Sequence, residues 1–200
     1  MVSHDLRAVI NLQKGSVNGF SVERNYINSK EYHDKFEKLP LSKPVIESLY
    51  KETGRLLEAV DGQEQKHMLA INARTGEPVI DNFSRPGHAG HTSFNEDEYN
   101  AICSVEDYIA LVHSHSYNRP PSGQDIATYA KDDHVKISLI ACHDGDLFAI
   151  ISAKKQVAEI YERAYNNFRE QFDSDTAKTL ATKLLYDENQ KHPLFDVRRL

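Results

Sequence analysis

The chain has 200 residues, which is the length of one domain with a sizeable core. Its formal net charge is −6, so no overall positive potential draws it toward nucleic acid or an anionic membrane. Hydrophobic residues make up 40% and charged residues 27% of the chain, values typical of soluble globular proteins. We therefore expect neither nucleic-acid nor membrane partners.

The apolar pattern predicts no leader and no membrane span. Residues 1–5 begin no basic-then-apolar segment, and no apolar run approaches the length of a bilayer. The two cysteines, Cys103 and Cys142, lie far apart and form no C-x-x-C pair, which is typical of a reducing compartment. We expect a cytoplasmic protein in which both cysteines are buried as small apolar residues.

The first part of the chain predicts two helices. Residues 1–28 contain an apolar stretch but no clear period, so an arm and an early strand both remain open. Ser29 is a good N-cap for a short helix that ends at Pro40. Apolar residues then recur every three or four positions over 44–60, which predicts an amphipathic helix.

The middle of the chain predicts a hairpin, a loop and a further helix. Residues 66–73 and 78–83 read as strands joined by a tight turn. A loop rich in small and turn residues follows over 84–93. Residues 95–106 then predict a helix. We expect its inner side to carry Tyr99, Ile102 and Cys103.

The second half alternates strands and helices. An apolar run at 108–112 leads into two histidines, and a capped helix is expected over 122–132. Residues 135–142 and 147–151 read as strands joined across Asp144-Gly145. The sequence therefore predicts an α/β (α+β) fold with a mixed sheet flanked by helices.

The C-terminal quarter predicts two more helices. An aromatic stripe at helical spacing runs from Val157 to Phe172, and Ser174 or Asp175 could cap the next helix. The last residues, 195–200, fit no pattern. We expect an N-terminal extension at 1–43, a core at 44–153, and a helical extension at 154–200 packed on that core. The stripe predicts core packing or a homo-oligomer interface formed by these helices.

Two histidines and an aspartate predict a metal site. His113 and His115 alternate at the end of a strand, so both imidazoles lie on one face. Ser122 and Asp125 are spaced as the cap and the third residue of a helix, and the intervening loop could fold the carboxylate onto the imidazoles. Alone, Ser122 and Asp125 would be a helix cap, and His113 and His115 would be an ordinary pair on a partly exposed strand. Together they offer two nitrogens, one oxygen and an open position, the donor set of a catalytic zinc.

This order of residues resembles the JAMM, or MPN-plus, metallopeptidases, whose signature is an upstream Glu, His-x-His, a short spacer and Ser-x-x-Asp. The resemblance implies that His113, His115 and Asp125 bind Zn²⁺ and that Ser122 stabilises an oxyanion. It also implies a sandwich of the JAMM or cytidine-deaminase type, closer in style to bacterial or phage members than to eukaryotic deubiquitinases.

The resemblance further implies a glutamate that acts as general acid and base, at the start of an earlier strand. Glu64, just before the strand expected at 66–73, is the first choice. Glu77 is the second, and Glu58 falls on the polar side of its helix. The implied activity is zinc-dependent hydrolysis of a peptide or isopeptide bond in a protein or peptide substrate, using a metal-activated water.

Two other functions remain open. The spacer between His115 and Ser122 has six residues, one fewer than is usual in the family. The alternative is therefore a catalytically silent JAMM-fold interaction or scaffold module. A metal-dependent nuclease using the same histidines is disfavoured by the negative charge. The sequence contains no P-loop, dinucleotide-binding glycine motif or G-x-S-x-G elbow.

Overall fold

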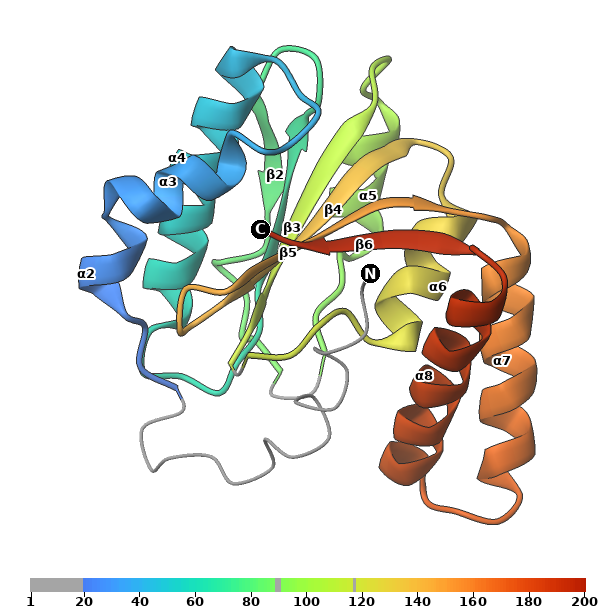
Figure 1. The fold of residues 1–200 in the computed structure, drawn as a ribbon. Helices are drawn as coiled ribbons and strands as arrows, with labels where there is room; N and C mark the ends of the chain where they lie inside the picture. The colour runs from blue at the N-terminus through green and yellow to red at the C-terminus, as the bar shows by residue number, and fades with distance from the viewer. Residues whose placement is uncertain (1–19, 89–90, 117) are drawn as a thin grey trace.

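The computed structural model describes residues 20–88, 91–116 and 118–200 (Figure 1). The expectations for residues 1–19 lie outside the described residues. The strands are β1 (Met68–Asn72), β2 (Pro78–Asp81), β3 (Ile109–His115), β4 (Val135–Cys142), β5 (Leu147–Ala153) and β6 (Phe195–Arg199). The helices are α2 (Arg24–Ile27), α3 (Lys30–Phe36), α4 (Lys43–Val60), α5 (Glu96–Cys103), α6 (Gly123–Lys131), α7 (Gln156–Arg169) and α8 (Ser174–Lys191).

Within the described chain, six strands form one mixed sheet in the order β2-β1-β3-β4-β5-β6. β3 and β4 are parallel, and each of the other neighbouring pairs is antiparallel. The parallel pair requires a crossover, which α6 provides. Figure 1 shows α3 and α4 on one side of the sheet and α6, α7 and α8 on the other. The predicted α/β (α+β) class, a mixed sheet flanked by helices, is confirmed.

α3 and α4 form where the sequence predicts helices, whereas α2 lies in a stretch for which an arm and a strand were left open. Ser29 caps α3, because its Oγ accepts a hydrogen bond from the Tyr32 amide at 3.2 Å. α4 begins with proline in its first turn and buries one apolar side. That side packs with one face of the sheet in a single apolar cluster, which includes Leu49, Leu56, Val112 and Leu139.

The opposite face of the sheet is covered by α6, α7 and α8. Their buried side chains form a second cluster with the strands, which includes Ile126, Ile140, Phe148, Tyr161 and Leu185. The aromatic stripe of α7 therefore contributes to the core through Tyr161, which is only 2% exposed. His113 and His115 pair with Ile140 and Cys142 of this cluster, so the two histidines share this face of the sheet.

Three sequence expectations at the ends of elements are wrong. Cys103 and Tyr99 were expected inside α5, yet both are exposed and Ile102 alone of the three is buried. α8 is capped by Asp173 rather than by Ser174 or Asp175. The Asp173 carboxylate accepts hydrogen bonds from the backbone amides of Asp175 and Thr176. Cys142 is buried, as expected.

The C-terminal segment adds a strand that the sequence did not predict. β6 pairs with β5 in antiparallel orientation, from Phe195 opposite Ala153 to Arg199 opposite Phe148. The segment 154–200 therefore contributes to the sheet as well as to the helical layer. No helix in the described ranges is both long and apolar enough to cross a bilayer.

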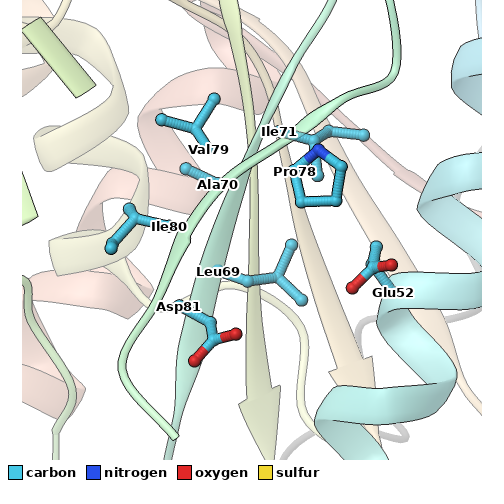
Figure 2. Close-up of a pocket in the computed structure, with 8 residues that line it drawn as sticks. All are labelled: Glu52, Leu69, Ala70, Ile71, Pro78, Val79, Ile80 and Asp81. Carbon is cyan, nitrogen blue, oxygen red and sulfur yellow. The ribbon is translucent and has the colours of Figure 1, made fainter. Parts of the chain in front are cut away.

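A hollow of about 250 Å³ lies at the β1–β2 edge of the sheet, beside α4 (Figure 2). It is lined by apolar residues of the two strands together with Glu52 and Asp81. Glu52 is buried and forms an ion pair with Arg55 on the same helix. None of the residues predicted to bind metal lines this hollow, so the candidate site must be built from side chains elsewhere.

Candidate metal centre

The candidate site lies where β3 ends and α6 begins. His113 and His115 are alternate residues of β3 and share one face of the sheet. Two prolines follow the strand, and Ser122 then starts α6 with a capping box. In that box the Ser122 amide donates to Asp125 Oδ2 at 2.7 Å, and the Asp125 amide donates to Ser122 Oγ at 3.2 Å. The cap therefore turns Asp125 back toward the strand.

The three predicted ligands meet in the structure. Nε2 of His113 lies 3.6 Å from Oδ1 of Asp125, and Nε2 of His115 lies 3.8 Å from Oδ2. One ligand atom from each residue can be chosen so that all lie within 4.8 Å of one another. Zinc bonds of about 2.0–2.1 Å in a tetrahedron place donor atoms about 3.3 Å apart. Small side-chain movements would therefore bring the three donors onto one ion.

The side chains of His113 and His115 are only 12% and 10% exposed, and their contacts leave an Nε2 atom of each ring for coordination. Nε2 of His113 is buried and has no hydrogen-bond partner among the residues that the structure describes, which is costly for a polar atom. Nδ1 of His115 lies 3.3 Å from the carbonyl oxygen of Arg119. That contact favours the proton on Nδ1 and leaves Nε2 with a free lone pair, as for histidines that bind metals.

The charge states of the site are those that a metal requires. Burial lowers the pKa of His113, and burial together with the neighbouring His113 lowers the pKa of His115 to about 3. Burial raises the pKa of Asp125, but the two imidazoles and the hydrogen bonds from Ser122 outweigh it, so this pKa lies below its usual value. At neutral pH the site therefore offers two neutral imidazoles and one carboxylate.

The low histidine pKa values predict that the metal-free protein loses stability in mild acid. The unfolded chain binds protons on these histidines below pH 6.5, whereas the folded chain does not bind a proton at His115 until about pH 3. The contribution of His115 to the free energy of unfolding is therefore complete above pH 6.5 and decreases as the pH falls toward 3. Urea unfolding with chelator present should show a loss of about 2 kcal/mol from His115 between pH 7.5 and 5. A His115→Gln variant with the same pH dependence as wild type would contradict this.

Ser122 holds the ligand carboxylate in place. Its hydroxyl donates a hydrogen bond to Asp125 Oδ2 at 2.7 Å, in addition to the hydrogen bond from the Ser122 backbone amide. Ser122→Ala should destabilise the protein by about 1 kcal/mol through loss of the cap. It should also weaken zinc binding by about 10–100-fold, because the carboxylate loses a partner that orients it. Chelator competition measures the second effect, and Ser122→Thr, which keeps a hydroxyl, should retain most of the affinity.

The three candidate glutamates are not part of the cluster of ligand atoms. Glu64 is exposed, in a bend four residues before β1 begins. Glu77 is exposed beside β2, and its carbonyl accepts from the Asn72 amide at the end of β1 away from the histidines. Glu58 is exposed on α4, which covers the opposite face of the sheet.

Lys66 is the charged residue that this part of the chain directs toward the histidines, and the sequence reading missed it. β1 pairs Met68 with His113, and the Ser114 amide donates to the His67 carbonyl at 3.1 Å. Lys66 lies next to this hydrogen bond, two residues before β1, and it acts electrostatically on His113, His115 and Asp125. The available signal was the alternation of residues 66 and 68, but using it required the register of β1 on β3.

Comparisons of this chain with protein families, with curated proteins and with solved structures give no match.

Proposed function

We propose that the chain is a zinc-dependent hydrolase of peptide or isopeptide bonds, of the JAMM type that its sequence resembles. The observation that carries the proposal is the convergence of His113, His115 and Asp125, with donor atoms 3.6 and 3.8 Å apart. Two nitrogens and one oxygen form the donor set of catalytic zinc sites, in which the fourth position is left for water or substrate. The buried Nε2 of His113, which lacks a hydrogen-bond partner in the described chain, supports a cation at this place.

When bound, Zn²⁺ would lower the pKa of a water molecule to about 7 and polarise the substrate carbonyl. His113, His115 and Asp125 would hold the ion, and the Arg119 carbonyl would keep the His115 ring oriented. Glu64 is the proposed residue that takes the water's proton and delivers it to the leaving amine. Ser122 is the proposed donor to the oxyanion, a role in which its hydroxyl would leave Asp125 Oδ2.

A second function is favoured by the placement of these last two residues. Glu64 is exposed, and the Ser122 hydroxyl already donates to Asp125. A chain that binds the metal for structure alone, as an interaction or scaffold module, would keep Ser122 in the cap and need no general base. The two functions share the metal and differ in whether a bond is cleaved.

The test joins metal analysis to an activity assay. Protein purified without added metal should contain zinc close to one equivalent, and iron in its place would contradict the zinc assignment, since two histidines and a carboxylate also bind Fe²⁺. Cleavage of mixed peptide and isopeptide substrates should stop with chelator and return with Zn²⁺. Glu64→Gln should reduce kcat by about 10²–10⁴-fold, whereas Glu77→Gln should not.

Each outcome of this assay selects one function. Cleavage that survives both the chelator and Glu64→Gln would exclude the proposed mechanism. Stoichiometric zinc with no cleavage of any substrate in the panel would favour the scaffold module. Loss of activity in Glu77→Gln with full activity in Glu64→Gln would transfer the role of general base to Glu77.

A further inference from the structure

Lys66 is an unusual residue to find beside a cation site. It lies two residues before β1, next to His67, whose carbonyl accepts from the Ser114 amide near the end of β3. It acts electrostatically on all three candidate ligands, His113, His115 and Asp125. Its backbone is fixed there, because the Lys66 amide donates to the His88 carbonyl at 3.0 Å. The residue is only partly exposed, so its side chain cannot simply extend into bulk water.

Among the described residues, none forms an ion pair with the ammonium group of Lys66. In the described ranges no ion pair within 4.0 Å and no side-chain hydrogen bond involves it. Its favourable electrostatic interaction is chiefly with Asp125, which already faces two imidazoles. Burial lowers the pKa of Lys66, a sign that the charge is partly removed from water. A partly buried charge without a partner is costly unless a ligand supplies one.

Further positive charge surrounds the same position. Arg119, from the loop between β3 and α6, and Lys178, from α8, both act electrostatically on Lys66. Of these cations, Lys66 is the one that also acts on His113 and His115, in a chain whose net charge is −6. A positive charge at this position attracts an anion.

We propose that Lys66 binds a carboxylate of the substrate beside the metal centre, and that it selects peptides with a carboxylate close to the cleaved bond. This inference rests on the proposed hydrolase function. Carboxylates are the anionic groups that peptides carry, at the C-terminus and on acidic side chains, and an ammonium binds them through charge-assisted hydrogen bonds. Lys66 is thereby a specificity-determining residue, and it is distinct from the three metal ligands.

The test compares two small probes that differ in one charge. N-acetylglycine carries a peptide carbonyl and a carboxylate, and N-acetylglycinamide is its neutral counterpart of nearly equal size. Calorimetry on zinc-loaded protein gives the ratio of their affinities. Lys66→Met should reduce the preference for the carboxylate by about tenfold or more, and Lys66→Arg should retain most of it. Lys51→Met, at an exposed site on α4, is the matched control and should keep the full preference.

The outcomes separate this inference from the proposed function. Zinc content is measured first on every sample, and wild-type protein that binds no zinc would contradict the proposed function. Wild type and Lys66→Met with equal zinc and an equal preference for N-acetylglycine would overturn the role of Lys66. Inorganic phosphate is the third probe. If Lys66→Met weakened phosphate binding tenfold but left the N-acetylglycine preference intact, the carboxylate assignment would be overturned.

Discussion

Replacing His113 by alanine should abolish stoichiometric zinc binding. Zinc in sites of this kind is held by several strong bonds, so the loss of one of three protein ligands should weaken binding by about 100-fold or more. Asp125→Asn should have a similar effect, because an amide oxygen lacks the charge of the carboxylate. His192→Ala, at the exposed C-terminal end of α8, is the control and should bind zinc as wild type does. Elemental analysis and competition with a chromogenic chelator measure the change.

Stability measurements distinguish this loss from unfolding. In the metal-free protein His113 Nε2 is buried and has no hydrogen-bond partner in the part of the chain that the structure describes. Its removal therefore relieves one unfavourable burial while it leaves a small cavity. Metal-free His113→Ala should match metal-free wild type within about 1 kcal/mol. Added zinc should raise the unfolding temperature of wild type alone, by mass action. Equal stabilisation of both proteins by zinc would place the ion elsewhere.

Gly123→Ala should be among the most destabilising single changes near the site. A Cβ at this position would lie 2.6 Å from the Tyr161 ring and 3.0 Å from Thr182 Oγ1. Tyr161 is 2% exposed and cannot move freely, so the start of α6 must shift away from α7 and α8. We expect a loss of about 1–3 kcal/mol in the free energy of unfolding. Zinc affinity should fall as well, because Asp125 lies in the same helical turn.

Gly54 is the matched control for this change. It lies inside α4, and an added Cβ would meet no atom within 4 Å. Alanine restricts the unfolded chain and favours the helix, so Gly54→Ala should stabilise the protein by about 0.5–1 kcal/mol. Urea unfolding should therefore show that the two substitutions change the free energy of unfolding in opposite directions. Destabilisation by Gly54→Ala as large as that by Gly123→Ala would remove the steric explanation.

The parts of the fold that sequence reasoning predicted are those set by local chemistry. The caps at Ser29 and Ser122, the apolar period of α4 and the turn at Gly145, whose φ is 84°, act within a few residues. β6 was missed because its strand character comes from pairing with β5 across two intervening helices. The orientation of α5 was wrong at Tyr99 and Cys103, since so short a helix leaves its buried side to tertiary contacts.

The same division applies to the candidate site. Its three ligands follow from the two-residue period of a strand and the first turn of the next helix, so their spacing alone predicted their convergence. The position of Lys66, just before β1, depends instead on how β1 aligns with β3, which lies much later in the sequence. The family resemblance implies Glu64 as the general base, which stays a prediction, but it gave no reason to single out Lys66, two residues further along the chain. The neighbours of the candidate metal site are thus harder to predict than its candidate ligands.

The two cysteines of this chain differ in exposure, so their reaction with a thiol reagent can report on local opening of the sheet. Cys103 is exposed at the end of α5, and Cys142 is buried on β4 opposite His115. Burial raises the pKa of the Cys142 thiol, which keeps it protonated and unreactive while the sheet is closed. A maleimide dye would therefore label the native protein at one position without mutagenesis. Slow modification of the second thiol would report how often β4 opens beside the candidate ligands on β3.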